Sequence, residues 1–421
     1  MSSSTHTGVS RRSFMRILGA ASAAATSFPA LAAVQQTTGA PAAQGPGGRR
    51  GFGGDMGEMR HISTDTVIIS SNENPLGPAQ SALSAISVTA PLGGRYHQEE
   101  TMKTVAVFSD LFGLKKGYVA LTPGSGGPLD LALMSNIGPD KPLVYGDPSY
   151  EQGFRAAETM KAPKVPVPLT STYAHDVKAM VKAHPSPGAY YIVNPNNPTA
   201  TITPREDILW LLANKPAGSV VIVDEAYHHF SNEDSVIDQV AADKDIIVLR
   251  TFSKIYGMAG LRAGVAVARP DLLAKFSTVA APARSLASIS ITSSAAARAS
   301  LQDKDLVTLR RKINADVRAE TLEFLEKHNY KVLPGSQANF FMIDVKRPGR
   351  DFQASMIKEN IAIGRSWPAM PNYVRVTVGT KPEMEKFQTA FVKCMDLPPG
   401  AANGASLHLP EFHAPSELYR G

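Results

Sequence analysis

Lys254 is the residue of this sequence that is best suited to covalent chemistry. It lies in TFSKIYGMAGLRAG, Thr251 to Gly264, among small residues and eight positions before Arg262. A lysine amine forms an imine with an aldehyde when burial and neighbouring charge lower its pKa enough. The glycines let the loop approach an anion closely, and donors for that anion are available from Thr251, Ser253 and Arg262. The stretch therefore predicts a carbonyl-binding lysine next to an anion site.

A glycine-rich turn supplies a second source of anion-binding groups. TPGSGGPLDLALMSNIG, Thr122 to Gly138, opens an amphipathic helix, with Pro128 in the first turn, where its missing N–H costs nothing. Free amides at a helix start and the helix dipole favour an anion there. Such a turn is often only a turn, so the prediction of a phosphate site depends on its combination with Ser253 and Arg262. The residues expected at the helix start are Ser125, Gly126 and Gly127.

Three apolar runs are expected to be strands that position these groups. SVVIVDEAY, Ser219 to Tyr227, is a buried strand that presents Asp224, and DIIVLRTFSK, Asp245 to Lys254, delivers Lys254. AYYIVNPNNPT, Ala189 to Thr199, runs into an Asn/Pro turn. In open α/β sheets, ligands bind at the carboxyl ends of strands. The sequence therefore predicts an α/β fold with a mainly parallel sheet, whose strand ends form one site.

A lysine, a phosphate site and a strand-end aspartate together favour pyridoxal 5'-phosphate as the cofactor. Asp224 would keep the pyridine nitrogen protonated, so that the ring accepts the electrons of a substrate carbanion. Asn197 and Tyr227 are placed to hydrogen-bond the phenolic oxygen, and Tyr150, in GDPSYEQ, can stack on the ring. Each residue taken singly can be structural. Their joint occurrence favours the cofactor site.

The sequence resembles the fold-type I aminotransferases, most closely the histidinol-phosphate aminotransferase branch of class I/II, over about Ser70 to Val392. The motifs that carry the resemblance occur in family order: NENPLG, GRY, GSGG, DPSY, PNNPT, DEAY, SKIYGMAGLRAG and VRVTVG. The resemblance implies a large cofactor domain, a small α+β domain and a homodimer with shared active sites. Tyr96, in GRY, is expected to reach the cofactor phosphate of the neighbouring subunit.

The resemblance also implies roles for individual residues. Lys254 forms the imine with the cofactor and moves the substrate proton, and Arg375 clamps the α-carboxylate with two hydrogen bonds, where lysine would be a poor replacement. Arg365, in IAIGRSW, is either a second substrate contact or a surface ion pair. The residues expected to be catalytic are Lys254, Asp224 and Tyr227. Those expected to bind the cofactor are Tyr96, Ser125, Gly126, Gly127, Tyr150, Asn197, Asp224, Tyr227, Thr251, Ser253, Lys254 and Arg262. Those expected to bind substrate are Arg375, Arg365 and Asn74.

The expected reaction is transfer of an amino group from an amino acid or amine to a 2-oxo acid in a ping-pong cycle. A decarboxylase, oxidase or lyase remains an alternative, because the cofactor stabilises any carbanion next to the imine. A non-catalytic cofactor- or amine-binding periplasmic protein is a second alternative. Departures from the family pattern, such as Ala200 in place of glycine and His97-Gln98 after GRY, leave the substrate open.

The N-terminus resembles a twin-arginine export signal. SRRSFMR, Ser10 to Arg16, precedes a short alanine-rich run, and Ala30-Leu31-Ala32 has the pattern of a cleavage site. The run is too short for a membrane anchor. We therefore expect a protein exported in the folded state to the periplasm, or otherwise outside the cytoplasm, by the twin-arginine translocation machinery. The predicted segments are a signal peptide (1–33), a disordered linker (34–60), an N-terminal arm (61–95), a large domain (96–285), a small domain (286–395) and a tail (396–421).

Composition argues against nucleic-acid binding, disulfide bonds and metal sites. Of the formal net charge of +6, residues 1 to 60 contribute 6 − 2 = +4, so the remainder carries only +2 and no nucleic-acid-binding stripe is expected. The single cysteine, Cys394, excludes an intramolecular disulfide and a cysteine metal cluster. His228 and His229 are expected to be structural or substrate-lining, because neighbours on a strand point to opposite faces. No metal site is therefore predicted.

Overall fold

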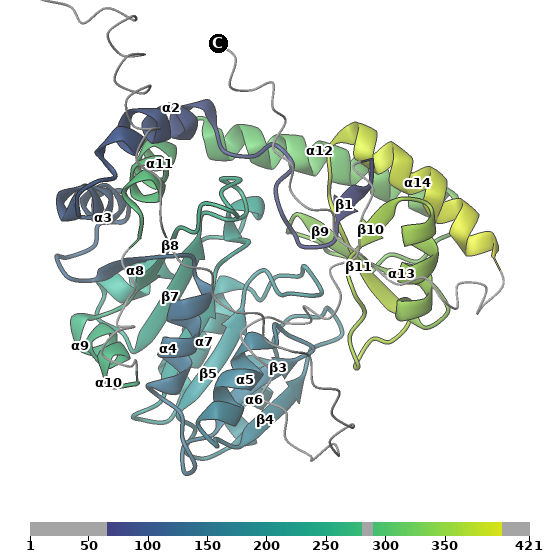
Figure 1. The fold of residues 1–421 in the computed structure, drawn as a ribbon. Coiled ribbons are helices and arrows are strands. Elements are labelled where there is room, and N and C mark those ends of the chain that lie inside the picture. Colours follow the sequence, from purple (N-terminus) through teal and green to yellow (C-terminus); the bar gives the residue numbers. More distant parts are fainter. Residues whose placement is uncertain (1–64, 280–288, 398–421) are drawn as a thin grey trace, which may run out of the picture. The chain divides into compact units, whose positions relative to one another are not determined.

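A seven-stranded sheet forms the framework of the larger part of the protein. The computed structural model describes residues 65–279 and 289–397. The sheet order is β2-β8-β7-β6-β5-β3-β4, and all neighbours are parallel except β8, which runs antiparallel to both β7 and β2 (Figure 1). The mainly parallel α/β sheet predicted from the sequence is therefore confirmed. Its strands are β2 (Val119–Thr122), β3 (Leu143–Asp147), β4 (Lys164–Pro168), β5 (Ala189–Val193), β6 (Val220–Asp224), β7 (Ile246–Thr251) and β8 (Gly264–Val267).

The central strands β5, β6 and β7 are buried at every position. Alternate residues enter two separate cores, so that Val221 and Val223 pack on one side of the sheet while Ile222 packs on the other. Burial of both faces explains why these strands are continuous apolar runs rather than alternating ones. The helices of this part include α4 (Gly126–Met134), α5 (Gln152–Thr159), α6 (Val177–Ala183), α7 (Arg205–Asn214), α8 (Ile237–Ala241), α9 (Pro270–Ala274) and α10 (Phe276–Val279).

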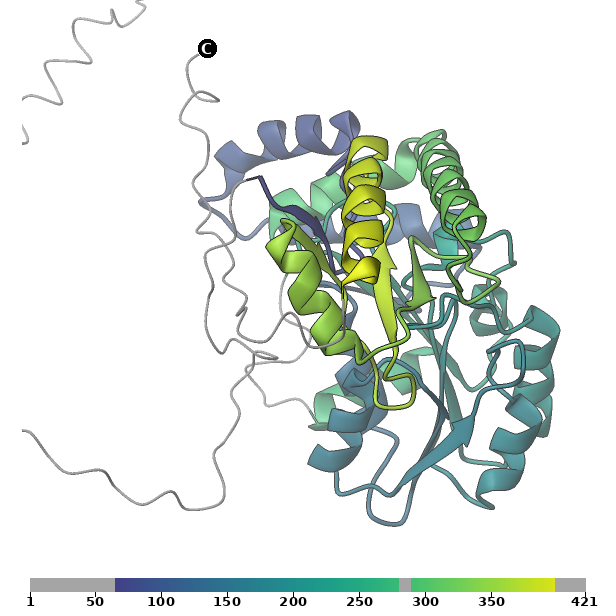
Figure 2. The same cartoon turned by 90° about the vertical axis from the view of Figure 1, so that its right-hand side faces the viewer.

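The smaller part contains two short sheets. β1 (Val67–Ile69) runs parallel to β10 (Ile361–Ile363), and β9 (Phe340–Asp344) runs antiparallel to β11 (Tyr373–Thr377). The helices α12 (Leu306–Lys327), α13 (Gly349–Lys358) and α14 (Lys381–Asp396) lie around them (Figures 1 and 2). The shared core includes the fully buried rings of Phe341, Phe352, Phe387 and Phe391. The first described strand of the chain thus belongs to the same sheet as a strand almost 300 residues later.

A helical layer packs against the core of the larger part of the protein. α11 (Ile291–Gln302) packs against α2 (Gln80–Thr89) and α3 (Gln98–Phe112), with η1 (Ala90–Leu92) between the last two. After α11 the chain continues directly into the long helix α12. The predicted signal peptide, linker and most of the tail lie outside the described residues. Within the described ranges, no helix combines the length and apolar character that a membrane crossing requires.

Candidate active site

Lys254 lies in the loop that follows β7. Its Nζ donates a hydrogen bond to the Ser71 carbonyl at 3.1 Å and lies 5.5 Å from the centre of the Tyr227 ring. Burial, reinforced by the nearby guanidinium of Arg375, lowers the pKa of Lys254 to about 8. At mildly basic pH a large fraction of this amine is therefore unprotonated and nucleophilic.

Asp224 ends β6 and is 4% exposed. One carboxylate oxygen accepts a hydrogen bond from the Ala226 amide at 3.0 Å. Burial raises the pKa of Asp224 to about 6, and the charge of Lys254 partly opposes this rise. Because a buried carboxylate is costly unless a positive group compensates it, this position favours a cationic ligand group such as a protonated pyridine nitrogen.

The start of α4 forms one side of an anion site. Gly124, at φ +82°, leads into Ser125, which occupies the N-cap position of α4 without a side-chain capping hydrogen bond. A Cβ added to Gly264 would lie 2.5 Å from the Gly124 carbonyl carbon, so Gly264 is required for the close approach of β8 to this turn, while Gly124 is required by its positive φ. The first amides of the helix, at Gly126 and Gly127, have no acceptor within the helix and are available to an anion.

The loop after β7 forms the other side of the anion site. The Thr251 hydroxyl donates to the Ser253 hydroxyl at 2.9 Å and accepts the Ser253 amide at 3.1 Å, so Thr251 positions Ser253. The Arg262 guanidinium approaches the Ser253 hydroxyl at 3.5 Å and packs against Gly124. The predicted phosphate-binding groups from two separate segments are thus brought together.

Arg375 lies on β11 and reaches across to the larger part of the protein. Its Nη1 donates to the Asn197 side-chain oxygen at 2.8 Å, and its Nη2 donates to the Ser70 carbonyl at 2.7 Å. Its Nε is buried and, among the described residues, has no hydrogen-bond partner. A buried donor without a partner is costly, so Arg375 is suited to an incoming acceptor such as a carboxylate.

Asn72 is a site residue that the sequence interpretation did not single out, although it lies within the NENPLG motif. It is 1% exposed and has a φ of 54°. Its Nδ2 donates to the Tyr227 hydroxyl at 3.0 Å. The Thr377 hydroxyl donates to the Asn72 side-chain oxygen at 3.1 Å and accepts the Asn72 amide at 2.9 Å. Asn72 therefore fixes the Tyr227 phenol from the arm and is itself fixed by β11.

The other predicted substrate residues have partners within the chain. Both terminal nitrogens of Arg365 bind the Glu151 carboxylate, so the ion-pair alternative is the one present in the structure. The side chain of Asn74 donates to the Ile255 carbonyl at 3.0 Å and accepts the Leu76 amide at 3.1 Å. Asn74 thus shapes the turn of the arm.

The two remaining tyrosines differ in their surroundings. The Tyr150 hydroxyl donates to the Gln152 side-chain oxygen at 3.2 Å, and Gln152 donates to the Gly126 carbonyl at 2.6 Å, which places Tyr150 beside the anion site. Tyr96, by contrast, is 97% exposed. Ala200, where the family pattern has glycine, adopts a φ of 62°, a left-handed conformation that glycine adopts with less strain.

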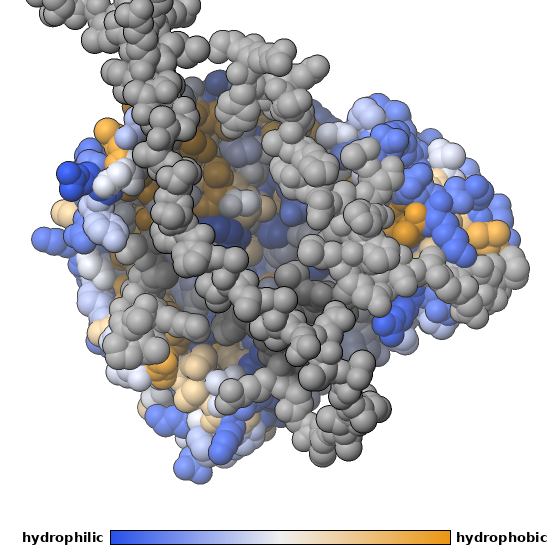
Figure 3. Space-filling model, viewed as in Figure 1, coloured by the Kyte–Doolittle hydropathy of each residue, from blue (hydrophilic) through white to orange (hydrophobic). Residues whose placement is uncertain are grey.

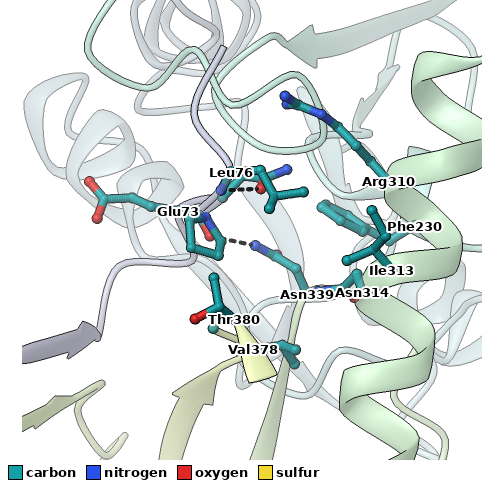
Figure 4. Close-up of a pocket in the computed structure, with 12 residues that line it drawn as sticks. Glu73, Leu76, Phe230, Arg310, Ile313, Asn314, Asn339, Val378 and Thr380 are labelled. Carbon is teal, nitrogen blue, oxygen red and sulfur yellow. Dashed lines mark hydrogen bonds between the residues drawn. The ribbon is translucent and has the colours of Figure 1, made fainter. Parts of the chain in front are cut away.

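A small pocket is lined on one side by the arm residues Glu73 to Leu76, and Lys254 is not among its lining residues (Figure 4). Its apolar lining includes Leu76, Phe230 and Val378. Asn339 projects between these side chains and donates to the Asn72 and Glu73 carbonyls at 3.1 and 3.2 Å. The pocket is therefore adjacent to the residues that position Asn72.

Contrary to the expectation from the sequence, His228 and His229 do not lie on a strand. They belong to η2 (His228–Phe230), a 3₁₀ turn. β6 ends at Asp224, the first residue of DEAY, and the other three residues of this motif follow outside the strand. Over the described part of the chain, no group of three or more histidine, cysteine or carboxylate side chains is arranged to hold a metal ion.

Comparison with known proteins identifies the family. Residues 64–391 match the model for aminotransferase class I and II. The chain is a class I and II aminotransferase. Histidinol-phosphate aminotransferase 1 of Nitrosococcus oceani is 32% identical to it over 326 residues, 76% of this chain and 86% of the relative. An aromatic amino acid aminotransferase of Cutibacterium acnes is 30% identical over 328 residues, 76% of this chain and 90% of the relative.

Solved structures agree with this assignment. A crystal structure described as a histidinol-phosphate aminotransferase, from Erwinia carotovora atroseptica, superposes on this aminotransferase with a TM-score of 0.73 and 31% identity, covering 78% of this chain and 95% of the other. The enzyme from Sinorhizobium meliloti, solved with pyridoxal 5'-phosphate, gives a TM-score of 0.71 at 23% identity, covering 78% and 90%, and shares the fold.

The cofactor of this aminotransferase is pyridoxal 5'-phosphate. The residues present fit that group at three points. The α4 start and Arg262 suit its phosphate, the buried Asp224 suits its pyridine nitrogen, and Lys254 suits its aldehyde. The predictions of the family, of the cofactor and of a transaminase are thereby confirmed.

Proposed function

We propose that the protein transfers the amino group of an α-amino acid to a 2-oxo acid, with Lys254 as the proton-transfer group and Arg375 as the carboxylate clamp. The observation that carries this proposal is the position of Lys254. Its amine has a pKa lowered to about 8 and shares one site with the buried Asp224 and with Arg375. Acceptance and return of a proton near neutral pH requires such a lowered pKa.

Each side chain has a separate task in this proposal. Arg375 orients the substrate by its carboxylate, and Asn197, which accepts from Arg375 Nη1, holds the guanidinium in place. Lys254 removes the α-proton and later returns it. The Tyr227 hydroxyl accepts a hydrogen bond from Asn72 and would be free to donate its own proton to the cofactor's phenolic oxygen. When bound, the cofactor supplies the electron sink for the carbanion.

The half-reaction without an acceptor tests this proposal. The purified holoenzyme is mixed with single amino acids, and the released cofactor and products are identified by mass spectrometry. We expect pyridoxamine phosphate and the matching 2-oxo acid from at least one donor. Unchanged cofactor together with carbon dioxide, peroxide or ammonia would contradict transamination. The two relatives carry different substrate names, histidinol phosphate and aromatic amino acids, so the donor panel includes aromatic and aliphatic amino acids.

We propose further that the enzyme acts as a homodimer. Exposed apolar side chains gather on the helical layer of α2, η1 and α3, and hydrophobic surface is visible over this region (Figure 3). They are Leu83, Val88, Leu92, Tyr96 and Met102. Contiguous exposed apolar surface is typical of subunit interfaces, and Tyr96 would then complete the partner's phosphate site. Sedimentation should give twice the chain mass, and a monomer with full activity would exclude shared sites.

We also propose export by the twin-arginine route, on the basis of the Arg11-Arg12 pair, the short apolar run and the Ala30-Leu31-Ala32 pattern. Replacing both arginines with lysine should leave the precursor in the cytoplasm, as measured by cell fractionation and immunoblotting. Lysine keeps the charge, so loss of export would be due to the arginines themselves. Unchanged export of the double variant would refute this assignment.

A further inference from the structure

Arg365 and Glu151 form an ion pair beside Trp367, whose ring also lies near Arg375. Arg365 follows β10, and Glu151 immediately precedes α5, so the pair joins the smaller and larger parts of the protein. Both terminal guanidinium nitrogens bind the two carboxylate oxygens, with Nη1 to Oε1 at 3.0 Å. The guanidinium carbon also lies 4.2 Å from the centre of the Trp367 ring. Two-point pairing and ring contact together fix the orientation of the guanidinium more firmly than an ordinary surface pair does.

Trp367 connects this pair to the carboxylate clamp. The same ring lies 5.3 Å from the guanidinium carbon of Arg375, and Trp367 is buried. Burial lowers the pKa of Arg375 most, and Arg365 and Glu151 lie close enough to shift that pKa in opposite directions. Glu151 also directly follows Tyr150, the residue expected to lie against the cofactor ring. A substrate held by its α-carboxylate at Arg375 therefore has Arg365 and Glu151 close by.

We propose that Glu151 makes this aminotransferase select substrates whose side chain carries no negative charge. The inference depends on the proposed function, in which Arg375 binds the α-carboxylate. A second carboxylate or a phosphate on the substrate would find the terminal donors of Arg365 occupied and a like charge beside them. Specificity of this kind comes from repulsion of the wrong substrate as well as from attraction of the right one.

The same selection applies to the amino acceptor. In a ping-pong cycle, the donor and the 2-oxo acid occupy one pocket in turn, so both meet the same pair. We therefore expect uncharged oxo acids, such as pyruvate or phenylpyruvate, to be better acceptors than 2-oxoglutarate or oxaloacetate. A pair that served only to join the two parts of the protein would produce no such order among substrates.

The test is Glu151→Gln, which keeps the size of the side chain and removes its charge. With the holoenzyme, kcat/KM is measured for leucine, phenylalanine, glutamate and aspartate. We expect the ratio of kcat/KM for glutamate to kcat/KM for leucine to rise roughly tenfold or more, about the effect of one charged hydrogen bond.

A second variant and a control complete this test. Adding Arg365→Gln to Glu151→Gln should abolish the rise in this ratio. Glu158→Gln is the matched control, because Glu158 is exposed on α5 and pairs with Lys164 at 2.7 Å. An unchanged ratio in Glu151→Gln would overturn the proposal.

A binding measurement separates this inference from the proposed function. Calorimetric titration with glutarate and with pentanoate compares two inert acids of equal chain length. In Glu151→Gln, glutarate should bind about tenfold more tightly while pentanoate changes little. Equal changes for both acids would indicate a structural tether and contradict selection by charge. If no amino acid is turned over but glutarate binding tightens, selection by charge stands and the proposed reaction fails.

Discussion

Replacing Lys254 with alanine is expected to lower kcat by at least about 10⁴-fold. General acid–base catalysis alone contributes roughly 10² to 10⁴-fold, and the variant also loses the amine that binds the cofactor aldehyde. The measurement is single-turnover formation of the 2-oxo acid with the best donor. Intact-mass analysis after borohydride reduction provides a second readout. The wild type should retain the mass of the cofactor, and Lys254→Ala should not.

Lys244→Ala is the appropriate control. Lys244 is exposed and immediately precedes Asp245 at the opposite end of β7, so the same substitution is made outside the site. Its activity and its cofactor mass should match those of the wild type. Substantial turnover by Lys254→Ala, with the cofactor still attached to another lysine, would contradict the assignment of Lys254.

Replacing Asp224 with asparagine is expected to reduce the rate of the half-reaction by about 10² to 10⁴-fold. Removing one member of a buried charge pair costs roughly 3 to 5 kcal/mol, and each 1.4 kcal/mol or so corresponds to a tenfold change in rate. Asparagine has nearly the same shape and can still accept the Ala226 amide, so the change is chiefly one of charge. Stopped-flow absorbance of the bound cofactor measures the rate. Asp234→Asn, an exposed position in the same segment, is the control.

In the cofactor-free protein, the same substitution should increase stability, although it lowers the activity of the holoenzyme. Because the folded-state pKa of Asp224 is raised to about 6 from 3.8, its contribution to stability is fully present below about pH 3.8 and is lost as the pH rises through 6. At pH 8 the buried charge destabilises the fold. The cofactor-free Asp224→Asn variant should therefore melt at a higher temperature than the cofactor-free wild type. A lower melting temperature would indicate that Asp224 is a structural group.

The site residues that could be predicted from the sequence are those whose position is determined by neighbouring residues in the chain. The runs that became β5, β6 and β7 are apolar at every residue, so their burial could be read from composition, and Asp224 and Lys254 follow from where the runs end. The glycine turn before α4 likewise signals a helix start within a few residues. In each of these cases the physical cause lies within about ten residues of the side chain concerned.

The contacts that the sequence could not provide are long-range. Asn72 and Thr377 are 305 residues apart, and Arg365 and Glu151 are 214 apart. Their pairing depends on the register of β11 and on the docking of β1 against β10, and hydrophobic periodicity encodes neither. For Arg365, the sequence indicated that an ion pair was one possible role, but it did not identify Glu151 as the partner. The 3₁₀ turn at His228 was missed because DEAY follows a strand pattern without a turn signal.

The pairing of Asn72 with β11 has a consequence for how the active site is held together. Arg375 and Thr377 are two residues apart on the same strand, so their side chains lie on the same face. Thr377 holds Asn72, and Asn72 holds the Tyr227 phenol, so the position of β11 helps to set the position of Tyr227. The carboxylate clamp and the phenol expected to face the cofactor therefore share one support, and neither can be repositioned independently of β11.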